Sequence, residues 1–368
     1  SQNYLWSPDE TQLLFTGTLS ARSLKTGGNF FLYDLQSKKF SQLTHSDGAQ
    51  MNVQFSHDGN KIGFVRAHNL YTLELASGKE TQLTFDGAEH RFNGHFDWVY
   101  EEEFSIIDGW QWSPDGGAIA YWQLDENRVP EFPIVNFIPL HQEITRQRYP
   151  KPGDPNAMVR IGVVKLSSGH TNWMDLGVPF DTTQDLYVPR MGWTPDGKLI
   201  IHRMNRHQNL LDVLLADPST GASAPFLREA EETWVDIKTD FLLLKRSKGV
   251  VWPSERDGYL HLYLFDQHGA LVRQLTKGAW DVERIVGVDE AEHTLYFTAS
   301  AATPLERDLY AVNLDGTGFR RITKGSGTHS VNAAPGMRYF LDSFSSVDDP
   351  PKLSMLSPDG SLVRVVEE

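Results

Sequence analysis

The chain has 368 residues, of which 40% are hydrophobic and 22% charged, with a formal net charge of −14 and a pI near 5.4. This acidic balance would repel phosphate backbones, and no run of Lys or Arg offsets it, so nucleic acid is excluded as a partner. No stretch approaches the ~18 apolar residues that a membrane span needs, and the lack of cysteine excludes disulfides, thiol catalysis and Cys-type zinc sites.

A sequence unit recurs from the first residues to the last. Each copy opens with an aromatic residue followed by Ser/Thr-Pro-Asp-Gly or a variant of it, continues with short apolar strands, and closes with Gln-Leu-Thr or a variant. In chain order, the openings are Trp6–Asp9, Phe55–Gly59, Trp112–Gly116 and Trp193–Gly197, and the closings are Gln42–Thr44, Gln82–Thr84, Gln274–Thr276 and Arg321–Thr323. The first two closings are 40 residues apart, a spacing typical of propeller blades.

The unit predicts a blade of four antiparallel strands, because Pro-Asp-Gly and Ser-Gly supply tight turns between short strands. We therefore expect an all-β fold, a single β-propeller domain over 1–368 with about seven visible four-stranded blades. The alternative is an open sandwich or a set of unrelated hairpins, which would not explain why Gln-Leu-Thr repeats in phase. The expected blades cover residues 1–44, 45–84, 110–176, 185–228, 234–276, 280–323 and 328–368.

Two insertions interrupt the repeat, and function is often carried by such additions to a regular fold. Residues 85–109 replace a short turn with FDGAEHRFNGHFDWVYEEEFSIIDG. Residues 123–164 are rich in proline, and we expect them to project from the propeller as an extended arm or hairpin.

Specific motifs then identify a family. Asp97–Phe104 reads DWVYEEEF and is followed by the WSPDG of Trp112–Gly116. Further matches follow in the same order along the chain: Val129–Pro130, Tyr149–Gly153, Arg206–Asn209, Trp252–Tyr259 and His261–Tyr263. Over essentially its whole length, the chain resembles the N-terminal propeller of the dipeptidyl peptidase IV family of serine peptidases, in its bacterial type.

The resemblance implies an eight-bladed propeller that gates an α/β-hydrolase domain, in an exopeptidase that releases N-terminal dipeptides with Pro or Ala second. It also implies a periplasmic or cell-envelope location. The 368 residues contain no Gly-x-Ser-x-Gly nucleophile motif, so we expect the hydrolase domain and its catalytic residues to be absent and this chain to be inactive by itself. Its expected partners are peptides with a free N-terminus and the hydrolase domain of the same parent chain.

The resemblance also assigns the site. Glu102 and Glu103 match the pair that binds the substrate's ammonium, and Arg22 resembles an arginine that binds a substrate carbonyl. Two carboxylates can accept from two of the three ammonium donors and so fix its direction. Because neighbouring strand residues point to opposite faces, the pair requires a helical turn or an irregular loop. The alternatives are a solvated acidic run, which we keep for Glu101, and a surface position for Arg22.

Other candidates receive no ligand role. Arg206–Asn209 matches the family motif but equally fits a polar strand. We expect His90 and His95 to be loop residues rather than metal ligands, and Trp98, Tyr100 and Trp110 to pack between blades rather than to line a substrate entrance. No metal or cofactor is expected. A competing function is a stand-alone periplasmic propeller scaffold that binds other proteins, although such a scaffold has no need of the acidic insertion.

Overall fold

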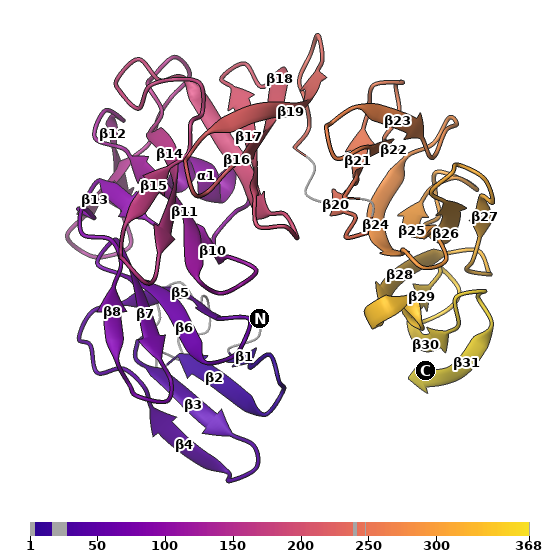
Figure 1. The fold of residues 1–368 in the computed structure, drawn as a ribbon, viewed down its shortest axis with the longest axis horizontal. Helices are drawn as coiled ribbons and strands as arrows, with labels where there is room; N and C mark the ends of the chain where they lie inside the picture. The colour runs from indigo at the N-terminus through magenta and orange to yellow at the C-terminus, as the bar shows by residue number, and fades with distance from the viewer. Residues whose placement is uncertain (1–3, 17–27, 238–240, 247, 368) are drawn as a thin grey trace. The chain divides into compact units, whose positions relative to one another are not determined.

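The computed structural model describes residues 4–16, 28–237, 241–246 and 248–367. The chain divides into two compact units, Ser1–Pro225 and Phe226–Glu368, and each is described by itself. Nearly all regular structure is β-strand (Figure 1), with α1 (Trp98–Glu102) the one α-helix of the described residues. None of the helices in these ranges has the length and apolar character needed to cross a membrane.

Antiparallel meanders form the sheets of the first unit. The first two sheets are β1 (Tyr4–Trp6), β2 (Gln12–Thr16), β3 (Phe30–Asp34) and β4 (Lys39–Gln42), then β5 (Gln50–Phe55), β6 (Lys61–Arg66), β7 (Asn69–Glu74) and β8 (Glu80–Gln82). The third contains β10 (Trp110–Trp112), β11 (Ala118–Asp125), β14 (Met158–Lys165) and β15 (Thr171–Trp173), with β9 (Arg91–Asn93) added beside β11. The fourth is β16 (Leu186–Trp193), β17 (Leu199–Asn205), β18 (Leu210–Ala216) and β19 (Ser223–Ala230), along which the chain passes into the second unit.

The second unit repeats the same four-stranded pattern. Its sheets are β20 (Leu242–Leu243), β21 (Val250–Ser254), β22 (His261–Phe265) and β23 (Leu271–Gln274); β24 (Val282–Asp289), β25 (Thr294–Ala299), β26 (Asp308–Asn313) and β27 (Arg320–Arg321); and β28 (Thr328–Ala333), β29 (Phe340–Ser345), β30 (Lys352–Leu356) and β31 (Leu362–Glu367), with a 3-10 turn at Pro335–Met337. The described residues thus form seven blade-like sheets, and the predicted all-β propeller class is confirmed.

Side-chain hydrogen bonds explain why the opening motif repeats. In the third sheet Ser113 Oγ donates to Asp115 Oδ1 at 2.5 Å, and Asp115 also accepts from the backbone N–H of Gly117 at 2.9 Å. Gly116 has φ +68°, a conformation that favours glycine. Equivalent bonds from Ser56 and Asn60 lower the pKa of Asp58 to about 2. The motif therefore fixes the turn between the first two strands of a blade.

The closing threonine ties the end of a blade back to its third strand. Thr84 Oγ1 accepts from the backbone N–H of Leu70 at 2.9 Å, and Gln82 Nε2 donates to the Thr84 carbonyl at 2.8 Å. The same threonine bond recurs in three other sheets, where Phe30 donates to Thr44, Leu262 to Thr276 and Leu309 to Thr323. All four threonines are buried. This contact is the physical reason that Gln-Leu-Thr recurs in phase.

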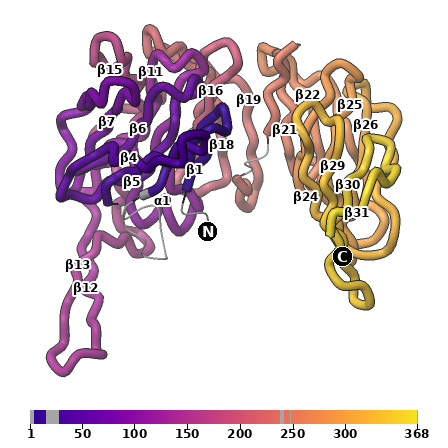
Figure 2. The backbone as a smooth tube through the Cα atoms, turned by 90° about the horizontal axis from the view of Figure 1, so that it is seen from below, coloured from indigo at the N-terminus to yellow at the C-terminus, as the bar shows by residue number. Residues whose placement is uncertain are grey.

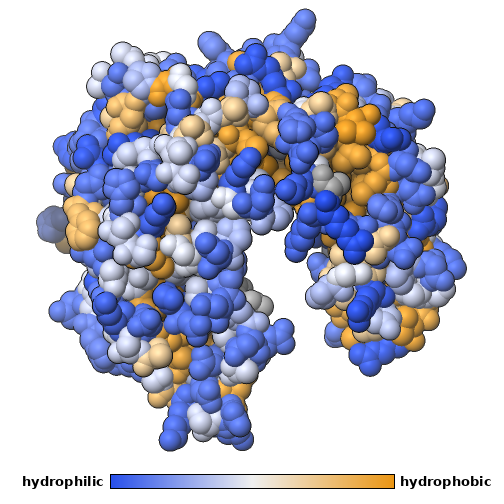
Figure 3. All heavy atoms as spheres, viewed as in Figure 1, coloured by the Kyte–Doolittle hydropathy of each residue, from blue (hydrophilic) through white to orange (hydrophobic). Residues whose placement is uncertain are grey.

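The cores lie between neighbouring sheets of the same unit. In the first unit, Leu14 and Phe30 pack with Ile62 and Phe64, and a second cluster joins Val65 and Leu70 to Trp110, Trp112 and Tyr121. In the second unit, the clusters are built around Phe297 and around Phe340. Trp, Phe and Leu side chains are thus prominent in the cores between blades. On the face shown in Figure 3 most side chains are hydrophilic, with apolar residues gathered in patches.

A hairpin leaves the third sheet between β11 and β14. Its strands, β12 (Glu131–Asn136) and β13 (Glu143–Arg148), pair only with each other and extend away from the rest of the first unit (Figure 2). The expected arm of 123–164 overlaps the blade at both ends, because β11 runs to Asp125, which lies opposite Met158 at the start of β14. The projecting segment is therefore shorter than that range.

Candidate functional site

The acidic triplet Glu101–Glu103 lies at the end of a single helical turn. Asp97 is the N-cap of α1 and its side chain accepts from the backbone N–H of Tyr100 at 3.0 Å. Glu102 is the last helical residue, and the backbone N–H of Glu103 closes the turn on the Val99 carbonyl at 2.9 Å. Asp is among the preferred N-cap residues, so the sequence itself starts the helix at this point.

The side chains of residues 99–103 differ in their exposure to solvent. Val99 and Tyr100 are buried, Glu101 is partly buried, and Glu102 and Glu103 are exposed. Consecutive residues of an α-helix differ by about 100° in direction, compared with about 180° in a strand. The exposed side chains of Glu102 and Glu103 are therefore not forced onto opposite faces, as neighbouring residues of a strand would be.

Two buried acids of the same region, Asp97 and Glu126, have raised pKa values. The pKa of Asp97 is raised from 3.8 to about 7, chiefly by burial and to a smaller extent by the negative charges of Glu126 and Glu101, while the hydrogen bond from the Tyr100 N–H acts against the rise. Burial also raises the pKa of Glu126, although His90 Nδ1 lies 3.0 Å from its Oε1 and favours the charged form. Nearby, Asp125 is paired with Arg91 at 2.7 Å. The charge of Asp125 is thus balanced by Arg91, and burial favours the neutral forms of Asp97 and Glu126.

The two predicted loop histidines make side-chain contacts inside the first unit. His90 contacts Glu126, and His95 Nε2 lies 2.9 Å from His68 Nδ1. Burial and the neighbouring His68 lower the pKa of His95 to about 3, so its ring is neutral. Within the described ranges, no group of three or more His, Cys, Asp or Glu side chains is arranged to hold a metal ion.

Comparison with known proteins identifies the family to which the chain belongs. Residues 7–351 match the family model of the dipeptidyl peptidase IV (DPP IV) N-terminal region. The chain belongs to the dipeptidyl peptidase IV family. This confirms the family predicted from the Asp97–Phe104 and Trp112–Gly116 motifs.

Relatives within the dipeptidyl peptidase IV family are longer than this chain. The probable dipeptidyl-aminopeptidase B of Emericella nidulans is 30% identical over 375 residues, which cover 92% of this chain and 41% of the relative. The crystal structure of Porphyromonas gingivalis dipeptidyl peptidase 4 matches with a TM-score of 0.88 and 27% identity, over 100% of this chain and 52% of that chain. A putative dipeptidyl aminopeptidase IV of Bacteroides ovatus shares the fold, with a TM-score of 0.79 and 24% identity over 97% and 51% of the two chains. The chain thus spans about half the length of these solved structures, or less in the fungal relative.

The other residues that sequence analysis singled out fall into three groups. Arg22 lies outside the described residues. Arg206 contacts Asp185 at 3.5 Å and donates to the Asp154 carbonyl at 2.6 Å, so it serves local structure. Tyr100 and Trp110 are buried, as expected for packing residues, whereas Trp98 is only partly buried and its ring centroid lies 4.3 Å from that of Tyr149.

Sequence reasoning missed two acids of this region. Asp97 carried a signal, because an Asp immediately before an apolar helical turn is a typical N-cap. Glu126 carried none, because its approach to His90 joins residues 36 positions apart across β9 and β11.

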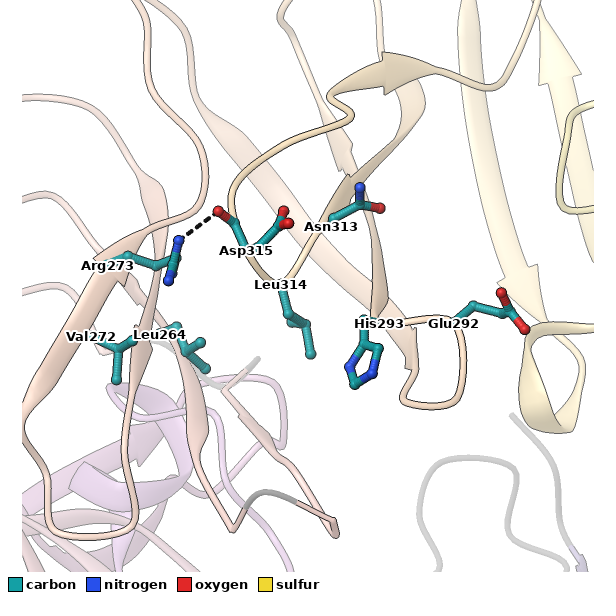
Figure 4. Close-up of a pocket in the computed structure, with 8 residues that line it drawn as sticks. All are labelled: Leu264, Val272, Arg273, Glu292, His293, Asn313, Leu314 and Asp315. Carbon is teal, nitrogen blue, oxygen red and sulfur yellow. Dashed lines mark hydrogen bonds between the residues drawn. The ribbon is translucent and has the colours of Figure 1, made fainter.

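A separate groove lies in the second unit (Figure 4). Its volume is about 500 Å³, and its lining includes Leu264, Val272 and Leu314, with Arg273 donating to the Asp315 carbonyl at 2.6 Å. The carboxylate of Glu292 points away from these apolar side chains in Figure 4. The two acids of the groove, Glu292 and Asp315, come from two different turns rather than from adjacent positions.

Proposed function

We propose that this chain is the substrate-gating N-terminal region of a serine exopeptidase that releases dipeptides with Pro or Ala second from free N-termini. The observation that carries the proposal is the exposed Glu102–Glu103 pair at the end of a capped helical turn. Membership in the dipeptidyl peptidase IV family and the names of the relatives support it.

Glu102 and Glu103 bind the ammonium group of the peptide. Each carboxylate accepts one N–H bond, so that two of the three ammonium donors are directed and the third remains for another acceptor. The ammonium is thereby held at one end of the site, and the chain of the peptide extends from a fixed origin. A peptidase that counts two residues from the N-terminus needs such an origin.

The chemistry itself belongs to an α/β-hydrolase domain that acts with this region in the full-length protein. Binding energy gained at the ammonium holds the scissile bond near the nucleophile, so it contributes to the rate as well as to affinity. In this proposal the protein acts in the periplasm or cell envelope, where peptides with free N-termini are its substrates.

Product analysis of the full-length protein tests the function. We expect Ala-Pro-containing or Gly-Pro-containing peptides to lose one N-terminal dipeptide, identified by mass spectrometry, and matched N-acetylated peptides to remain intact. A serine-directed inhibitor should stop the release. If neither peptide is cleaved, the exopeptidase proposal fails and a protein-binding scaffold becomes the better interpretation. Equal cleavage of both peptides would show that the amino group is not recognised.

A further inference from the structure

The helical turn that carries Glu102 and Glu103 is fastened to an irregular part of β16. The pairing of β16 with β17 shifts between Tyr187, opposite Met204, and Arg190, opposite His202. Two residues of β16, Val188 and Pro189, therefore face one residue of β17, which is the pattern of a β-bulge. Pro189 has no N–H to donate, and the bulge takes the Val188 peptide groups out of the regular ladder.

Both peptide groups of Val188 are satisfied by side chains from other strands and turns. Its N–H donates to the hydroxyl of Tyr100 at 3.0 Å, and its carbonyl accepts from Trp122 Nε1 at 2.8 Å. Val188 is fully buried, so these groups require partners inside the protein. Tyr100 belongs to α1 and Trp122 to β11, which lie beside β16 in Figure 1. Val188 of β16 thus contacts both the helical turn, through Tyr100, and the preceding blade, through Trp122 of β11.

Aromatic packing holds the same residues. The rings of Phe96 and Tyr100 stack with centroids 5.4 Å apart, and Phe104 packs edge-on to Tyr100 at 5.2 Å and to Tyr187 at 5.1 Å. Burial raises the pKa of Tyr100 well above its ordinary value, so its hydroxyl stays protonated. The helix has only five residues, too few to be stable by itself. Its position therefore depends on these contacts.

We propose that Tyr100 is a positioning residue of the ammonium site. Its hydroxyl, bonded to Val188, sets where the helical turn ends and hence where the carboxylates of Glu102 and Glu103 lie relative to the blades. This inference rests on the proposed function of that pair. Tyr100 is buried at 2% exposure, so its role in this proposal does not require contact with the peptide. It acts only through the helical turn, at the end of which Glu102 and Glu103 bind.

Tyr100→Phe in the full-length protein is the direct test, because it removes the hydroxyl and keeps the ring. We expect kcat/KM for an Ala-Pro or Gly-Pro chromogenic amide to fall about 10- to 100-fold, the effect of moving a binding group by about 1 Å. Hydrolysis of a small activated ester without an amino group, such as p-nitrophenyl acetate, should change less than about twofold. A matched control is Tyr121→Phe, which removes another buried hydroxyl of the first unit, bonded to Thr171 at 3.4 Å. It should leave both activities near wild type.

A double-mutant cycle separates positioning from a general structural effect. If Tyr100 acts through the clamp, adding Tyr100→Phe to Glu102→Ala should lower kcat/KM much less than it does in the wild type, because coupled residues are not additive. Full additivity would overturn the inference and leave the Glu102–Glu103 proposal standing. Loss of ester hydrolysis in parallel with amide hydrolysis would overturn it too. If Glu102→Ala and Glu103→Ala have no effect, the clamp itself is wrong and the role of Tyr100 falls with it.

Trp122→Phe provides a second route if Tyr100→Phe does not fold. It removes the donor to the Val188 carbonyl while the Tyr100 hydroxyl remains. We expect the same selective loss on amide substrates, smaller in size. Unchanged amide hydrolysis in a folded Trp122→Phe protein would count against the bulge as the anchor of the helix.

Discussion

Removal of one carboxylate of the Glu102–Glu103 pair should lower the specificity constant strongly. Losing one partner of a largely desolvated charge pair costs about 2–5 kcal/mol, which corresponds to roughly 30-fold to several thousand-fold in kcat/KM. Both side chains are exposed in this structure, and one acceptor remains in each single variant. We therefore expect Glu102→Ala and Glu103→Ala to fall near the lower end of that range, and the double variant to lose more than either.

The assay compares variants of the full-length protein on Ala-Pro and Gly-Pro chromogenic amides. Glu101→Ala is the control, since Glu101 is partly buried and lies outside the exposed pair; it should change kcat/KM much less. The Glu102 and Glu103 variants should keep the wild-type circular dichroism spectrum, because exposed side chains contribute little packing, and the spectrum of Glu101→Ala is compared in the same way. Blocking the substrate's amino group should erase most of the difference between wild type and the Glu102 or Glu103 variants. The reasoning is refuted if Glu101→Ala proves the most damaging change, or if the Glu102 and Glu103 variants match wild type on free amines.

Three further predictions concern the chain 1–368 produced by itself. It should not hydrolyse a Gly-Pro chromogenic amide above background, since it holds no Gly-x-Ser-x-Gly nucleophile; activity sensitive to a serine-directed inhibitor would contradict this. The pKa of Asp97 is raised from its ordinary 3.8 to about 7 in the folded state, so folding favours the protonated carboxyl group. The stability that Asp97 contributes is therefore fully present below about pH 4 and is lost as the pH rises to about 7. Asp97→Asn, which keeps the acceptor for Tyr100, should therefore raise Tm relative to wild type more at pH 8 than at pH 5, and an equal shift at both would refute the assignment. Thr84→Val should destabilise the fold by about 1–3 kcal/mol in chemical denaturation because it leaves the buried Leu70 N–H unpaired, whereas Thr81→Val, at an exposed position of β8, should change little.

Local chemistry made much of the fold predictable. The turn motif at Ser113–Gly116 and the closing threonines act through hydrogen bonds within one blade, so they leave a periodic trace in the sequence. The seven sheets follow from that trace. Given the converging Glu102–Glu103 pair that the resemblance implied, strand geometry also predicted a helical turn or an irregular loop at this place, and the structure has a helical turn there.

Long-range contacts were not predictable in the same way. The sequence around Asn93 contains no signal that β9 pairs with β11, where Asn93 lies opposite Gln123. The partners of Val188 in the bulge, Trp122 and Tyr100, lie 66 and 88 residues away from it. Such contacts depend on how neighbouring blades meet, and a single sequence carries no periodic signal for them. The contact between Glu126 and His90, 36 positions apart, is also of this long-range kind, whereas Asp97 could be predicted as an N-cap.

The closing threonine bond has a consequence for how the chain folds as it is made. In all four sheets the bond joins residues 14 positions apart, so these four blades complete this contact without a distant segment of the chain. Low sequence separation favours rapid folding, and chains emerge from the ribosome from the N-terminus onwards. A blade such as β5–β8 can fasten its last strand soon after Thr84 emerges, before the Glu102–Glu103 turn exists. The acidic turn, by contrast, depends on Val188 of β16, which lies 88 residues after Tyr100, so it can reach its final position only after β16 has been made.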